Sequence, residues 1–194
     1  MCKERDDCRL FVSIPIERHF ARVFSRYRDA HDKIPYLRWT PERKLHLTVL
    51  FLGSVHRSLV AQLITALHDS IGVLQLFSLA FDKVSYAPPG RPADMVWAYF
   101  KEDVALNKLL RVVRAASLDV SITPADSCRG GGEITLPHVT LARFRGRPYG
   151  SLATLHRAGL EGNDMLVDQV LLTESRTTEG EAVYETLESY ALHT

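Results

Sequence analysis

The stretch HLTVLFLG, residues 46–53, predicts a β-strand with one polar, titratable face. Side chains two residues apart in a strand point to the same side of the sheet. We therefore expect His46 and Thr48 on one face and the apolar side chains, up to Phe51, on the other. Burying such polar groups without partners costs about 1–3 kcal/mol each, so their face should border a cleft or solvent.

The stretch PHVTLAR, residues 137–143, repeats this pattern half a chain later. His138 and Thr140 share a face, whereas strand alternation sends Arg143 to the other face unless a bulge intervenes. Taken alone, either histidine is more often a structural residue. Their repetition with identical spacing predicts two lobes related by approximate two-fold symmetry, with both histidines in a shared cleft.

Hydrophobic periodicity predicts a mixed order of strands and helices around these motifs. The expected strands cover residues 9–16, 75–86, 95–100, 165–175 and 183–192, and the expected helices cover residues 20–27, 59–67, 104–118 and, more weakly, 151–158. The stretches 87–94 and 119–135 have the composition of loops. This order favours an α+β fold of mainly antiparallel sheets with flanking helices. We interpret it as two pseudo-symmetric lobes around a central cleft, within one domain spanning residues 1–194.

The charges of the chain nearly cancel. Its 194 residues include 24 Lys and Arg against 23 Asp and Glu, so no broad positive field is available to hold a long nucleic-acid duplex. Any contact with nucleic acid should be local. The cluster of Arg143, Arg145 and Arg147 fits either a solvated strand edge or a phosphate site.

The three cysteines, Cys2, Cys8 and Cys128, are odd in number and lack the close pairs of a zinc site or a disulfide framework. A reducing compartment suits them best. The N-terminus is charged, and no run approaches the roughly 20 apolar residues of a membrane span. We therefore expect a cytoplasmic protein with no membrane partner.

No sequence signature indicates a cofactor. The glycine run 130–132 lacks the lysine and the strand-to-helix setting of a Walker-type phosphate loop. The histidines lack the helical spacing and the carboxylate partners of a zinc hydrolase. We therefore expect chemistry without a metal or a cofactor.

The two motifs resemble the signatures of a known family, the two-histidine phosphoesterases, and within it the RNA 2′,3′-cyclic phosphodiesterases once named 2′-5′ RNA ligases. Those signatures have the forms His-x-Thr-hydrophobic-x-Phe-Leu-Gly and Pro-His-x-Thr-Leu-Ala-Arg. The segments RLFVSIPI (9–16), RWTPERKLH (38–46) and VLLTESRTTEGEAVYETLESYAL (170–192) are also similar to that family.

The resemblance implies metal-independent opening of a 2′,3′-cyclic phosphate on RNA ends or small nucleotides, with a 2′-phosphate product and weak reverse 2′-5′ ligation. Histidine titrates near pH ~6.5, so one neutral and one protonated imidazole can serve as base and acid. We assign His46 as the acid on the departing 3′ oxygen and His138 as the base for water. Thr48 and Thr140 are expected to donate to the non-bridging phosphate oxygens.

Three further residues are candidates for substrate contacts. Arg143 suits a phosphate, and equally a structural ion pair. Trp39 and Tyr86 suit stacking on a nucleobase, and equally packing in the core.

Two other functions stay open at this point. The chain fits a two-histidine phosphoesterase acting on another bond, such as those of 2′-5′ oligoadenylates, ADP-ribose cyclic phosphate or uridylated RNA ends. It also fits a nucleotide- or RNA-binding module without catalysis. The loops 87–94 and 119–135 are expected to decide substrate choice, and no obligate protein partner is indicated.

Overall fold

The computed structural model describes residues 6–125, 136–146, 151–178 and 180–194. The helices in these ranges are α1 (Arg18–Ala30), α2 (Arg57–Ile71) and α3 (Val104–Asp119), with a 3₁₀ turn at Glu42–Lys44. The strands are β1 (Asp7–Pro15), β2 (Leu37–Trp39), β3 (His46–His56), β4 (Phe77–Ala87), β5 (Met95–Phe100), β6 (His138–Phe144), β7 (Asp164–Val167), β8 (Gln169–Thr178) and β9 (Glu181–Ala191).

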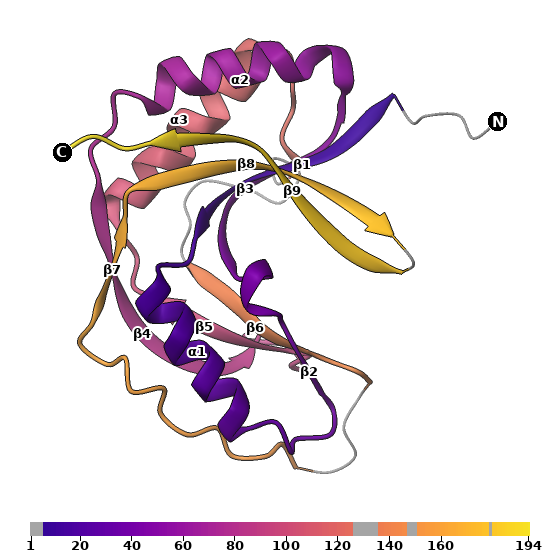
Figure 1. Cartoon of the computed structure of the whole chain (residues 1–194), viewed down its shortest axis with the longest axis vertical. Helices are drawn as coiled ribbons and strands as arrows, with labels where there is room; N and C mark the ends of the chain where they lie inside the picture. Colours follow the sequence, from indigo (N-terminus) through magenta and orange to yellow (C-terminus); the bar gives the residue numbers. More distant parts are fainter. Residues whose placement is uncertain (1–5, 126–135, 147–150, 179) are drawn as a thin grey trace.

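The strands form one continuous sheet in the order β7-β4-β5-β6-β3-β1-β8-β9, and β2 pairs with β6 beside this path. The pairings between these strands are antiparallel. The sheet is strongly curled, with α2 and α3 at one half and α1 at the other (Figure 1). The expected α+β fold of mainly antiparallel sheet with flanking helices is confirmed.

The main hydrophobic core of the described residues lies between the helices and one face of the sheet. It includes Phe20 and Phe24 of α1, Leu63 of α2 and Leu109 of α3, together with alternate side chains of the central strands. All three described helices thus bury their apolar residues on the same face, and the opposite face is left for a site. None of these helices is long and apolar enough to cross a membrane.

Residues 151–158 do not form the expected helix. Their backbone bonds to side chains instead: Ala153 N donates to Tyr36 Oη (2.8 Å), and Ala153 O accepts from Tyr86 Oη (2.9 Å). His156 O likewise accepts from Tyr27 Oη at 3.1 Å. So short a helix is marginal by itself, and these tertiary partners satisfy the backbone in an irregular path.

The expected strand 165–175 is two strands that break at Asp168. Although they follow one another directly, β7 pairs with β4 at one end of the sheet and β8 pairs with β1 near the other end. A parallel bridge between Gln75 and His193 also joins the segment before β4 to the segment after β9. The two ends of the curled sheet therefore meet on this side of the molecule, at β7 in Figure 1.

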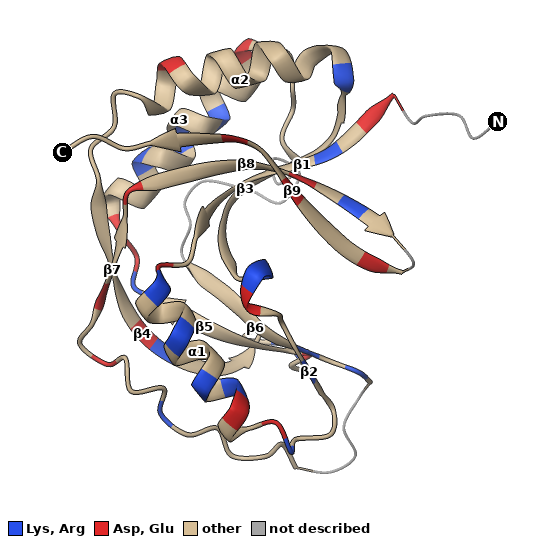
Figure 2. Cartoon of the chain, viewed as in Figure 1, with Lys and Arg blue, Asp and Glu red and all other residues tan. Residues whose placement is uncertain are grey.

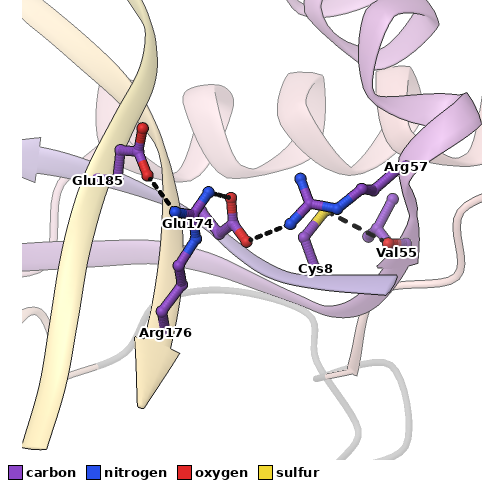
Figure 3. Close-up of polar contacts among 6 residues, drawn as sticks. All are labelled: Cys8, Val55, Arg57, Glu174, Arg176 and Glu185. Carbon is purple, nitrogen blue, oxygen red and sulfur yellow. Dashed lines mark hydrogen bonds and ion pairs between the residues drawn. The ribbon is translucent and has the colours of Figure 1, made fainter. Parts of the chain in front are cut away.

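A buried carboxylate holds together one end of the half formed by β1, β3, β8 and β9. Glu174 is 2% exposed and accepts hydrogen bonds from Arg57 Nη2 (3.1 Å) and Arg176 Nη2 (2.8 Å). Arg176 also pairs with Glu185 on β9 at 3.0 Å (Figure 3). The hydrogen bond from Arg176 lowers the pKa of Glu174, and the charges of both arginines add to this effect.

Cys8 lies beside this network and is a free, buried cysteine (Figure 3). Its thiol donates to Val55 O at 3.4 Å, and burial together with the nearby Glu174 charge raises its pKa. A buried thiol of raised pKa is a poor nucleophile, so Cys8 packs like a small apolar residue. Cys2 and Cys128 lie outside the described residues.

Glu174→Gln should destabilise the fold at neutral pH by about 1–3 kcal/mol, because its charge-assisted hydrogen bonds are weakened in a buried place. The lowered pKa of Glu174 means that its carboxylate stabilises the fold above its ordinary value of 4.5, and that this contribution is lost as the pH falls further. Urea unfolding between pH 7 and pH 3 measures this, and the wild type and the variant should converge at low pH. The exposed Glu161→Gln is the control. A difference that stays constant over this pH range would contradict the assignment.

Candidate active site

The two His-x-Thr motifs lie side by side because β3 and β6 pair at one point. Leu47 is the partner of Val139, and both side chains are fully buried in the core. The residues that flank them therefore point to the opposite face, with His46 level with Thr140 and Thr48 level with His138. Side chains at such positions have Cβ atoms about 4.5–5.5 Å apart. The structure thus brings the two histidines and the two threonines into one group of four.

Both imidazoles are anchored in the same way. His46 Nδ1 lies 2.8 Å from Lys44 O, and His138 Nδ1 lies 2.9 Å from Leu136 O, in each case two residues earlier. A carbonyl oxygen only accepts, so each Nδ1 carries a hydrogen and each neutral ring has its lone pair on Nε2. No hydrogen bond joins either Nε2 to a described residue, so both are available to a substrate.

A β-bulge turns Arg143 toward the histidines. In the pairing of β5 with β6, Val96 lies opposite Ala142 and Trp97 opposite Thr140, so Leu141 is an extra residue. Leu141 and Ala142 are both buried, and Arg143 returns to the face of His138 and is exposed. This is the bulge on which the sequence-based placement of Arg143 depended.

An equivalent bulge lies in β3. Val12 is opposite Leu50 and Ser13 is opposite Thr48, so Val49 is the extra residue. Phe51 is consequently on the histidine face, 47% exposed, with its ring 6.0 Å from that of Phe11. The expectation from strict alternation, which sent Phe51 to the opposite face, was wrong for this reason.

Arg143 dominates the formal charge around the histidines. It is the sole Lys, Arg, Asp or Glu in β3, β5 and β6, and Figure 2 shows these central strands almost uncharged. Burial lowers the pKa of both histidines, and the charge of Arg143 lowers it further. His46 adds to the effect on His138. With no ligand, the site therefore favours two neutral imidazoles beside one guanidinium.

Aromatic rings surround the histidines, and sequence analysis missed them. The ring of His46 lies 5.0 Å from that of Phe11 and 5.3 Å from that of Tyr184 on β9. His138 is stacked on Trp97 of β5, with 3.6 Å between the ring centroids. The β5 sequence MVWAYF is apolar throughout, so alternation gives no sign that Trp97 faces a site.

Trp39 and Tyr86 lie on the helix side of the sheet. The ring of Trp39 lies 6.1 Å from that of Tyr27 on α1, and Tyr86 packs edge-on against Phe144. Tyr86 also holds the 151–158 segment through its hydroxyl. The structure does not bring either side chain to the histidines, so the sequence-based expectation that they stack on a nucleobase is corrected: a base would have to stack elsewhere.

Two other expectations concern the arginine cluster at residues 143–147 and the absence of a metal site. Arg145 is exposed and donates its backbone N–H to Tyr36 O, while Arg147 lies outside the described residues, as does most of the 119–135 loop. Within the described part of the chain, no group of three or more His, Cys, Asp or Glu side chains is arranged to hold a metal ion.

Sequence comparison finds similarity to phosphoesterases. Residues 14–97, which contain the first motif, match the family model described as LigT-like phosphoesterase. An RNA 2′,3′-cyclic phosphodiesterase of Geobacillus stearothermophilus is 28% identical over 134 residues, or 69% of this chain. The match spans 41% of that curated relative, which is considerably longer.

Solved structures share the whole fold. A Thermus thermophilus protein is similar with a TM-score of 0.78 and 21% identity, over 95% of this chain and 97% of that one. Escherichia coli LigT in its apo form is similar with a TM-score of 0.75 and 22% identity, over 98% and 100%. Its complex with 3′-AMP has a TM-score of 0.73 at 22% identity, over the same shares. At these identities the likeness establishes the fold.

Binding of sulfate should raise the pKa of both His46 and His138, because an anion between them offsets the burial and the Arg143 charge that lower it. By linkage, sulfate should bind more tightly as the pH falls from 8 to 5, a range in which sulfate itself does not titrate. NMR titration of the imidazoles with and without sulfate measures the first effect, and calorimetry the second. His68, exposed on α2, is the internal control. Unmoved titration of both histidines would contradict an anion site here.

Proposed function

We propose that this chain is a LigT-like, two-histidine phosphoesterase that hydrolyses 2′,3′-cyclic phosphates on RNA ends or small nucleotides to 2′-phosphomonoesters, without a metal. The observation that carries this proposal is the pair of imidazoles with Nδ1 anchored and Nε2 available. The resemblance to an RNA 2′,3′-cyclic phosphodiesterase favours this substrate class.

The proposed reaction uses one imidazole as base and the other as acid. His138 Nε2 takes a proton from water as the water oxygen bonds to phosphorus. His46, which is protonated when the anionic phosphate is bound, gives its Nε2 proton to the 3′ oxygen as the bond from phosphorus to that oxygen breaks. The product carries a 2′-phosphate, and proton exchange with solvent restores both rings. The same groups lower the barrier in reverse, which allows weak 2′-5′ ligation.

The negative charge of the transition state needs donors in place beforehand. Thr48 and Thr140 flank the histidines on the same face, and neither hydroxyl bonds to a described residue. We assign them to the non-bridging oxygens. Arg143 supplies the fixed charge, and its present contact, Nη1 to Met95 Sδ at 3.1 Å, is weak enough to exchange for a phosphate.

The nucleobase is assigned to the aromatic side chains around His46. Tyr184 is 37% exposed and lies edge-on to the His46 ring. The exposed Phe51 and Tyr184 both lie close to the ring of Phe11. An aromatic ring stacks on any base, contributing roughly 1–3 kcal/mol per base. Nucleotide binding by this fold has a precedent in E. coli LigT, which was crystallised with 3′-AMP. This assignment replaces Trp39 and Tyr86.

The enzyme should hydrolyse 2′,3′-cyclic AMP and RNA ending in a cyclic phosphate at equal rates with and without EDTA. His46→Ala and His138→Ala should each lower kcat/KM by roughly 10²–10⁴-fold, and the double variant should lose less than the product because the pair acts as a unit. Thr48→Ala and Thr140→Ala should lose on the order of 10²-fold. Chromatography of the products identifies the 2′-phosphate. Unchanged activity in both histidine variants, or restoration by added Mg²⁺ after EDTA, would contradict the proposal.

The roles of acid and base have a separate test. The profile of kcat/KM against pH should be bell-shaped, with limbs set by the coupled pair. A substrate whose 3′ leaving group is highly activated needs little protonation, so it should restore activity to His46→Ala and leave His138→Ala impaired. Selective rescue of His138→Ala would reverse the assignment.

A further inference from the structure

The two histidines share a motif and a backbone anchor but differ in their aromatic neighbours. His138 lies flat on the indole of Trp97, with ring centroids 3.6 Å apart and planes inclined by 14°. His46 meets Phe11 at 5.0 Å and 33°, and Tyr184 edge-on at 87°. One imidazole thus has an aromatic face parallel to its ring, and the other has not.

Trp97 is held rigidly in this position. It is 9% exposed in β5, opposite Thr140, and it packs with Ala87, Tyr99 and the partly buried Met95. Its buried Nε1 has no hydrogen-bond partner among the described residues, so packing alone fixes the indole. The group that Trp97 offers to the site is therefore the face of its ring.

The electrostatics of an indole face favour a cation above it. We infer that Trp97 is a positioning residue, which fixes the plane of the His138 ring and stabilises the imidazolium that forms as His138 takes a proton from water. This inference rests on the proposed function, with His138 as the base. It gives the base and the acid different environments although their motifs are alike.

The other groups facing His138 show why this contribution matters. Arg143 on the same strand and His46 on β3 both disfavour a positive charge on the ring. Tyr99, opposite His138 on β5, is uncharged at neutral pH, and Lys83 of β4 lies 5.9 Å from the Tyr99 ring. Among the described groups, the Leu136 carbonyl and the indole face are the ones that favour imidazolium.

Replacing Trp97 tests the inference, because the direction in which the pKa of His138 changes distinguishes a cation–π contact from the exclusion of water. Loss of the cation–π contact in Trp97→Leu should lower the pKa of His138 by roughly 0.4–1.5, with a smaller decrease in Trp97→Phe, which retains a ring. If the indole acted only by excluding water, Trp97→Leu would raise this pKa instead. NMR titration of the His138 imidazole in the full chain gives the answer.

Phe11→Leu is the matched control, since it removes the ring next to His46 and should leave the titration of His138 unchanged. Circular dichroism verifies the fold of each variant, and Trp97→Phe keeps the test decisive if Trp97→Leu does not fold. An unchanged or raised pKa of His138 in Trp97→Phe would overturn the inference.

Kinetics gives an independent readout. The acidic limb of the kcat/KM profile should move to lower pH in Trp97→Leu. The maximum of kcat/KM should fall roughly 2- to 30-fold, which is the free energy of the cation–π contact expressed as a rate. Trp97→Phe should recover part of this loss. The NMR titration needs no turnover, so an inactive wild type would refute the proposed function while leaving the effect of Trp97 on His138 measurable. A lower maximum of kcat/KM without a shift of its acidic limb would mean that Trp97 acts through packing alone, which would overturn the inference.

Discussion

The backbone pairing of Leu47 with Val139 is the constraint on which the site depends. It is the one pairing between β3 and β6, which are described along their full lengths, and it joins the two halves of the sheet. Because both side chains are completely buried, the residues on either side of them must face outward. A slip of one residue in either strand would turn the histidine of that strand toward the core and its buried apolar side chains toward solvent, so the stability of the core and the position of the chemistry are specified together.

Much of this arrangement could be predicted from the sequence, and the failures have identifiable causes. Alternation places His46 with Thr48 and His138 with Thr140 because it holds within each motif. It fails at Phe51 and Arg143 because each follows two adjacent apolar residues that are both buried, and the neighbouring strand decides which of them is extra. The irregular path of residues 151–158 is likewise set by partners distant in the sequence.

The electrostatics of the site follow from the lack of charged side chains other than Arg143 in the central strands β3, β5 and β6. The central strands keep one guanidinium and two partly buried imidazoles, so positive charge on the rings is disfavoured until an anion arrives. The difference between the two rings comes from outside their motifs, from Phe11 and Tyr184 on one side and Trp97 on the other. The repeated His-x-Thr motif therefore gives two similar histidine positions, and side chains from neighbouring strands give the two imidazoles different surroundings.

The break at Asp168 bears on how such a chain acquires its structure. The half of the sheet that holds His46 takes strands from both ends of the chain, because β8 and then β9 follow β1 in the sheet order. The half that holds His138 is built from β4, β5, β6 and β7. Pairings between distant segments are slow to form because long loops must close first. During synthesis on a ribosome, β1 must wait without its second neighbour until β8 (Gln169–Thr178) has been made.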